Sequence, residues 1–127
     1  MDNYKFCDTS AALKDAIDDL KVKSHIAFDC EGINLGQSGG HLSLVTLADA
    51  SSASSTIYVL DILALDASAL QPLFSLLGSK TSIKIVFDGR MDFSELFHRY
   101  NVELATVLDL QLVDVQSRVV RGEGMEK

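Results

Sequence analysis

The sequence predicts an α/β domain whose mixed sheet carries helices on both of its faces. Apolar runs of strand length alternate along the chain with segments whose apolar residues recur at helical spacing. Three such strands follow one another early in the chain and helices dominate its second half, which favours a mixed sheet. The 127 residues, 47% of them apolar, fit one domain that spans residues 1–127 and buries its own core.

The first half of the chain is expected to supply most of the sheet. Residues 4–7 favour a short edge strand, and the helix after it has an apolar face marked by Leu13, Ala16, Ile17 and Leu20. Three apolar runs then predict a meander of antiparallel strands at residues 25–31, 42–48 and 57–62. A loop with four glycines separates the first two runs, and a serine-rich turn separates the last two.

The second half is expected to add one strand and three helices. Residues 68–77 favour a helix that Gly78 ends, and residues 82–87 favour a strand. Asp88 and Asp109 are expected to cap the two remaining helices, the second of which covers residues 110–120. Three consecutive strands, then a helix, a strand and more helices, form the order typical of the ribonuclease H-like fold.

Charge and cysteine content narrow the class of protein. A formal net charge of −7 argues against a protein that coats nucleic acid, because such binding depends on Lys and Arg against phosphates. It remains compatible with a nuclease that gathers carboxylates around metal ions. Cys7 and Cys30 form no CxxC pair and are interpreted as reduced core thiols of an intracellular protein, in the cytoplasm or nucleus. The sequence predicts no membrane span and shows no signal peptide.

Asp29 and Glu31 end an otherwise apolar strand. Alternate side chains of a strand share a face, so both carboxylates are expected to point the same way. Two like charges this close repel each other, and a divalent cation such as Mg²⁺ would offset that cost. The competing interpretation is a strand end whose last side chains are simply solvated.

Asp92 is the second candidate of this kind. It lies at the start of the helix after the fourth long strand, where it can reach the carboxyl ends of the strands. It can equally be an acid that compensates the helix dipole, just as Asp88 is interpreted as a helix cap. The residues alone leave both interpretations of Asp92 open.

Four stretches together resemble the DEDD superfamily of 3′–5′ exonucleases, in its RNase D and Werner branch. Residues 28–32, Phe-Asp-Cys-Glu-Gly, resemble the first motif, whose core is Asp-x-Glu. Residues 84–92 are similar to the second motif, in which a Lys-Val-x-His strand precedes the ligand Asp by five residues. This alignment selects Asp92, and Phe87 stands where the His is frequent. Residues 42–48 and 107–112 resemble the family's second strand and its Phe-Asp-Thr-Gln stretch.

The resemblance implies a ribonuclease H-like fold and hydrolysis of phosphodiesters by two Mg²⁺ or Mn²⁺ ions. It implies that Asp29, Glu31 and Asp92 are catalytic metal ligands. Gly32 and Asp88 are the residues that would contact the substrate. That substrate would be the 3′ end of single-stranded RNA or DNA, and the choice between them depends on contacts with the 2′-hydroxyl group.

The family's third motif has no counterpart at the expected place. It consists of Tyr or His, three residues and then Asp, and in the family it lies downstream of the stretch that residues 107–112 resemble. Tyr4 with Asp8 and His25 with Asp29 have the spacing but lie upstream, so they do not count. The chain is therefore expected to lack the last helices of the family fold and to be inactive or impaired.

A second expectation follows from the same missing segment. The last helix should carry an apolar strip, built from residues such as Leu112, Val115 and Val119, without its usual cover. Exposed strips of this kind tend to find partners, so the chain is expected to self-associate through this helix.

Three alternatives stay open. The domain can be a non-catalytic RNA-binding or protein-interaction module of the same fold. It can be a haloacid dehalogenase-like phosphatase, although that family uses Asp-x-Asp where this chain has Asp29 and Glu31. It can also be a structural domain in which both acids are merely solvated.

Overall fold

The computed structural model describes residues 3–122, except for the side chain of Val115. One six-stranded sheet runs in the order β1-β4-β3-β2-β5-β6. Its strands are β1 (Tyr4–Cys7), β2 (His25–Ile33), β3 (His41–Asp49), β4 (Ile57–Asp61), β5 (Ile83–Val86) and β6 (Val107–Asp109). The predicted antiparallel meander is β2, β3 and β4, whereas the pairs β1–β4, β2–β5 and β5–β6 are parallel. The predicted mixed sheet is therefore confirmed.

Four α-helices accompany the sheet in the part of the chain between residues 3 and 122. They are α1 (Ser10–Leu20), α2 (Ala67–Leu77), α3 (Arg90–Tyr100) and α4 (Leu110–Val120), and a short 3₁₀ turn (Ile62–Ala64) follows β4. Thr9 caps α1 by accepting the N–H of Ala12 at 3.1 Å, and Asp66 caps α2 through Ala69. Gly78 ends α2, as the sequence predicts.

The core lies between one face of the sheet and the helices. Alternate residues of the central strands, Ile26, Phe28 and Cys30 on β2 among them, form one buried cluster with the apolar faces of α1 and α2 and with Leu96 of α3. On the opposite face, Leu110 at the start of α4 joins residues of β2, β3 and β5 around an apolar cavity of about 380 Å³. The described helices thus cover one face densely and touch the other through the start of α4.

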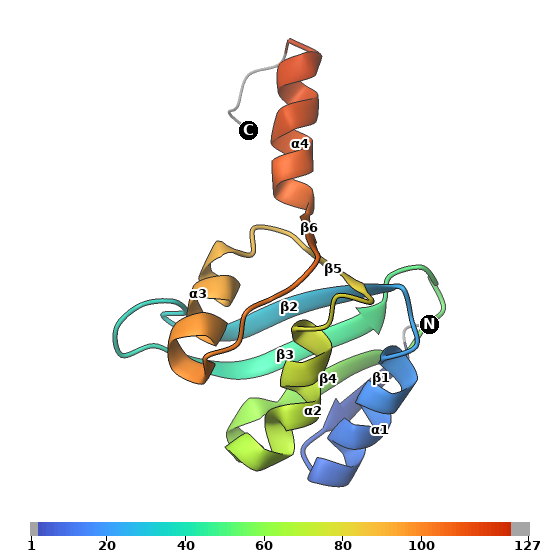
Figure 1. Ribbon diagram of the computed structural model, residues 1–127, viewed down its shortest axis with the longest axis vertical. Helices are drawn as coiled ribbons and strands as arrows, with labels where there is room; N and C mark the ends of the chain where they lie inside the picture. The colour runs from blue at the N-terminus through green and yellow to red at the C-terminus, as the bar shows by residue number, and fades with distance from the viewer. Residues whose placement is uncertain (1–2, 123–127) are drawn as a thin grey trace.

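Two features at the end of the described chain were not specified by the sequence. β6 adds a sixth strand, which pairs with β5 over three residues. α4 then projects away from the body of the molecule (Figure 1). Leu112 and Val119 on this helix are 66% and 60% exposed, which agrees with an uncovered strip, while the side chain of Val115 lies outside the described residues.

No helix within residues 3–122 combines the length and the apolar character that crossing a membrane requires. Cys7 and Cys30 are both buried and unbridged, as expected for core thiols.

Candidate active site

Asp29 and Glu31 lie on β2, in the middle of the sheet between β3 and β5. The strand alternates strictly here: Phe28 and Cys30 are buried under the helices, whereas Asp29 and Glu31 are exposed. Asp29 stands opposite Thr46 of β3, and Glu31 stands opposite Leu44. Both carboxylates therefore share the face of the sheet that the core does not use, as strand geometry requires.

Asp92 reaches this strand from α3. It lies in the first turn of the helix, and its side chain is buried at 8% exposure. Its Oδ2 atom accepts the backbone N–H of Cys30 at 3.2 Å. Because Cys30 stands between Asp29 and Glu31, this hydrogen bond places the third acid beside the two acids of the strand.

The nearby acids change the pKa of Asp92. Burial, followed by the charge of Asp29, raises the pKa of Asp92 to about 6, and the charge of Glu31 acts in the same direction. The hydrogen bonds from Cys30 oppose this rise without cancelling it. Burial foremost, and then Asp92 and Asp29, also raise the pKa of the Cys30 thiol. The region therefore holds more negative charge than its own donors compensate, which is a setting that favours a bound cation.

The side chains of Asp29, Glu31 and Asp92 have the chemistry that Mg²⁺ and Mn²⁺ prefer in their ligands, because all three are carboxylates. Within residues 3–122, however, no group of three or more His, Cys, Asp or Glu side chains is spaced closely enough to hold one metal ion. The roles of Asp29, Glu31 and Asp92 as metal ligands therefore stay predictions. Asp92 directs one oxygen to the N–H of Cys30, and repulsion among like charges opposes a closer approach.

Glu95, one turn after Asp92, is a buried acid that sequence reasoning missed. It is 2% exposed, accepts the N–H of Gly36 at 3.0 Å and pairs with Arg99. These contacts tie the loop between β2 and β3 to α3, beside a polar cavity of about 350 Å³ that His98 also lines. The spacing of Asp92, Glu95 and Arg99 on one side of a helix was the available signal.

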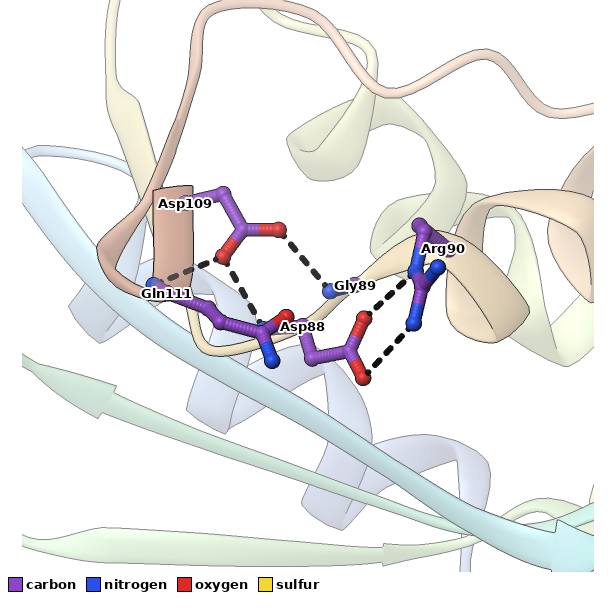
Figure 2. Close-up of polar contacts among 5 residues, drawn as sticks. All are labelled: Asp88, Gly89, Arg90, Asp109 and Gln111. Atoms are coloured by element: carbon purple, nitrogen blue, oxygen red, sulfur yellow. Dashed lines mark hydrogen bonds and ion pairs between the residues drawn. The ribbon is translucent and has the colours of Figure 1, made fainter. Parts of the chain in front are cut away.

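The turn between β5 and α3 corrects the interpretation of Asp88 as a helix cap. Gly89 is the N-cap residue of α3, and no side chain caps it. Asp88 takes the left-handed conformation, with φ 52°, and its carboxylate pairs with Arg90. The Asp-Gly pair makes a turn here, and the Asp88 carboxylate bonds the side chain of Arg90 instead of a backbone N–H of the first helical turn (Figure 2).

Asp109, rather than Asp88, is the acid whose carboxylate accepts backbone N–H groups in this region. Its two carboxylate oxygens accept the N–H groups of Asp88 and Gly89 at 2.9 and 3.0 Å, and one of them also accepts the N–H of Gln111 (Figure 2). The predicted cap of α4 is therefore confirmed, and the bonds to the turn are additional. Partial burial opposes ionisation, but the backbone N–H groups of Gly89, Asp88, Gln111 and Leu112 outweigh it and leave the pKa of Asp109 below its usual value.

Gly32 stands where β2 has a register shift relative to β3. A Cβ atom at this position would lie 2.2 Å from the carbonyl oxygen of His41. Close packing of two backbones is thus sufficient reason for glycine at this position.

These features of the sheet and its acids together point to one class of protein. A sheet of this order, with two acids on its central strand and a third from the helix after β5, defines a ribonuclease H-like nuclease domain. The chain belongs to the 3′–5′ exonuclease family, whose model matches residues 4–119. This membership rules out the phosphatase alternative. No protein with a curated description matches the chain.

Solved structures of the RNase D type share the fold. Trypanosoma brucei RNase D in complex with RNA U12 is 28% identical, with a TM-score of 0.79, over 90% of this chain and 39% of that one. Escherichia coli RNase D, an exoribonuclease involved in structured RNA processing, is 19% identical, with a TM-score of 0.75, over 98% and 35%. The EXD2 exonuclease domain soaked in Mg and GMP is 20% identical, with a TM-score of 0.71, over 92% and 61%. The chain therefore spans 39% of the first of these relatives.

Proposed function

We propose that this domain provides part of a metal-dependent active site that hydrolyses phosphodiester bonds at the 3′ end of single-stranded RNA or DNA. The observation that carries the proposal is the hydrogen bond from Cys30 N–H to Asp92, which brings a third acid to Asp29 and Glu31. Membership in the 3′–5′ exonuclease family and a relative crystallised with RNA U12 support the choice of substrate.

Asp29, Glu31 and Asp92 are the proposed metal ligands. Asp29 and Glu31 are exposed and can meet a cation from the open face of the sheet. Asp92 is buried, and the backbone N–H of Cys30 donates to its carboxylate. Bound Mg²⁺ or Mn²⁺ would supply a polarised water and would offset charge on the departing oxygen. Gly32, which follows Glu31, and Asp88, which lies four residues before Asp92, are proposed to contact the substrate.

The proposed activity of residues 1–127 on their own is little or none. The three acids lack the fourth carboxylate and the Tyr or His of the third motif, which would place the attacking water. A non-catalytic binding module of the same fold is the second candidate. The absence of a metal-spaced group of acids within residues 3–122 favours it.

We also propose that the chain self-associates through α4 and works inside the cell. The exposed apolar side chains of α4 include Leu112, Val113, Val119 and Val120. The free, buried thiols of Cys7 and Cys30 agree with a reducing compartment.

The test begins with metal, because metal binding is upstream of catalysis. Mn²⁺ should raise the melting temperature of the chain, as any ligand of the native state does, and Asp29→Asn should remove most of that rise. Asp66→Asn, at a cap on α2, is the matched control and should keep it. An equal rise in wild type and Asp29→Asn would contradict the ligand assignment.

The second arm is a nuclease assay with a 3′-labelled and a 5′-labelled single strand, run beside light scattering. We expect no sustained trimming and a mass above that of the monomer. Vigorous trimming by a monomer would mean that another residue of this chain supplies the fourth ligand.

A further inference from the structure

We infer that Asp109 is a positioning residue for the candidate active site: by holding the turn between β5 and α3, its carboxylate fixes the place of Asp92. The inference rests on the function proposed above, because Asp92 matters only if the acids of the site act together. Nothing in the Asp-x-Glu or second-motif stretches assigns such a role to Asp109.

The turn between β5 and α3 lacks a cap of its own. Asp88 adopts a positive φ that residues other than glycine seldom take, and its carboxylate is engaged with Arg90 at 2.8 Å. Gly89 has no side chain with which to cap the helix, and a Cβ atom there would lie within 2.9 Å of Phe93 and Val86. The conformation of this turn therefore needs partners from another element.

Asp109 provides those partners from β6. Asp109 pairs in register with Val86, the last residue of β5, so its side chain is carried to the turn by the sheet itself. One oxygen accepts the N–H of Asp88 and the other accepts the N–H of Gly89 (Figure 2). Two bonds from one carboxylate fix the direction of the turn as well as its distance, because both oxygens belong to one rigid plane.

The turn between β5 and α3 also fixes where α3 begins. The carbonyl oxygen of Gly89 accepts the N–H of Phe93 at 2.8 Å, and this bond closes the first turn of the helix around Asp92. Asp92 then reaches Cys30 N–H across 3.2 Å, a length that leaves little tolerance for a shift of the helix start. The path from Asp109 to Cys30 thus consists of backbone and side-chain hydrogen bonds and one helical turn.

A different role would be purely local. Asp109 also caps α4 through Gln111, and losing a cap weakens a helix without altering a distant site. The two roles differ in what they predict for the Cys30 amide. A cap of α4 has no effect on that amide, whereas a positioning residue protects it through Asp92.

The experiment measures amide hydrogen exchange and Mn²⁺ affinity in the whole chain and in three variants. Asp109→Ala removes both acceptors. Asp109→Asn preserves volume and one acceptor oxygen, and it serves if the alanine variant fails to fold. Asp66→Ala is the matched control, since Asp66 caps α2 by accepting Ala69 N–H at 2.8 Å.

We expect the Cys30 amide to exchange about tenfold faster in Asp109→Ala, while amides of α1 and β4 keep their protection. The dissociation constant for Mn²⁺ should rise about tenfold, the lower end of the cost of losing an orienting partner. Asp109→Asn should fall between wild type and Asp109→Ala. Asp66→Ala should leave both quantities within about twofold of wild type, since it removes a cap of similar kind elsewhere.

Unchanged exchange of the Cys30 amide in both Asp109 variants would overturn the inference, whatever happens to α4. Equal acceleration in Asp66→Ala would overturn it too, because the effect would then be general. A wild-type chain that binds no Mn²⁺ would refute the proposed metal site. In that case the Cys30 amide alone decides whether Asp109 positions Asp92.

Discussion

Replacing Asp92 by Asn should stabilise the metal-free protein at neutral pH. Asp92 is buried beside two other acids, and its pKa rises from the ordinary 3.8 to about 6. Asn has nearly the same shape and keeps an oxygen that can accept Cys30 N–H, so the variant removes the charge and retains the hydrogen bond. A gain in stability from the loss of a hydrogen-bonding acid is an unusual expectation, and the buried charge is its reason.

The size of the effect follows from the pKa. Each pKa unit corresponds to about 1.4 kcal/mol, so a rise from 3.8 to about 6 means that ionised Asp92 costs the folded state up to about 3 kcal/mol. The negative charge of Asp92 also stabilises the N-terminus of α3 by about 0.3–1 kcal/mol, and the Asn variant would lose this contribution. We expect a net gain of about 1–2 kcal/mol for Asp92→Asn well above pH 6.

The pH dependence has a definite sign. The folded state binds a proton at Asp92 more readily than the unfolded state does, so the wild-type protein loses stability as pH rises from 3.8 through about 6. The advantage of Asp92→Asn should therefore be absent near pH 4 and complete by about pH 7.5. Asp109→Asn should behave oppositely, since the pKa of Asp109 is lowered: its disadvantage should shrink as pH falls.

The assay is urea unfolding of both variants and wild type in EDTA, with differences taken at each pH so that other groups cancel. The range is about pH 4 to pH 8 for Asp92→Asn and extends down to about pH 2.5 for Asp109→Asn, because the lowered pKa of Asp109 places its effect below about pH 4. A difference for Asp92→Asn that stays constant with pH would refute the reasoning. So would a variant less stable than wild type at pH 8. Added Mn²⁺ should reverse the order at pH 7.5, because it would stabilise the wild-type protein more.

Three further predictions concern single residues. Lys84→Met should lower the free energy of unfolding by about 2 kcal/mol, because the fully buried ammonium group donates to two serine carbonyl groups and a serine hydroxyl; a loss under about 0.5 kcal/mol in urea unfolding would contradict this. Gly89→Ala should cost about 1–3 kcal/mol through overpacking, whereas Gly78→Ala, whose Cβ has ordinary room, should cost less in the same assay. Leu112→Gln, at an exposed position of α4, should reduce the mass seen by light scattering, and an unchanged mass would exclude this helix as the contact.

The sequence was most informative where a pattern repeats. The strand at residues 25–31 could be predicted with the faces of its side chains, because Phe28 and Cys30 alternate with Asp29 and Glu31, and burial follows that alternation. β6 could not be predicted in this way, since three residues are too few to show a period. β6 pairs with the edge of β5 that lies opposite β2.

The candidate site was predicted in its residues but not in its supports. Asp29, Glu31 and Asp92 could be selected from motifs, and their ligand roles stay predictions. The cap at Asp88 was wrong because the choice between a cap and a turn depends on Asp109, which lies 21 positions away. Glu95 was missed for a related reason: its local spacing from Arg99 does not reveal that it is buried, and its other partner, Gly36, lies 59 positions away.

The place of β1 in the sheet has a consequence for how the protein folds. β1 is synthesised well before β4, with which it pairs, so Tyr4 cannot meet Ile57 until β4 has been made. The hairpin of β2 and β3 and its neighbour β4 need only short loops and can assemble before β1 has a partner. β1 is therefore expected to join the sheet late, when the edge of β4 already exists. Until then Cys7, the buried residue of β1 in the folded structure, would stay open to solvent together with the unpaired edge of β4.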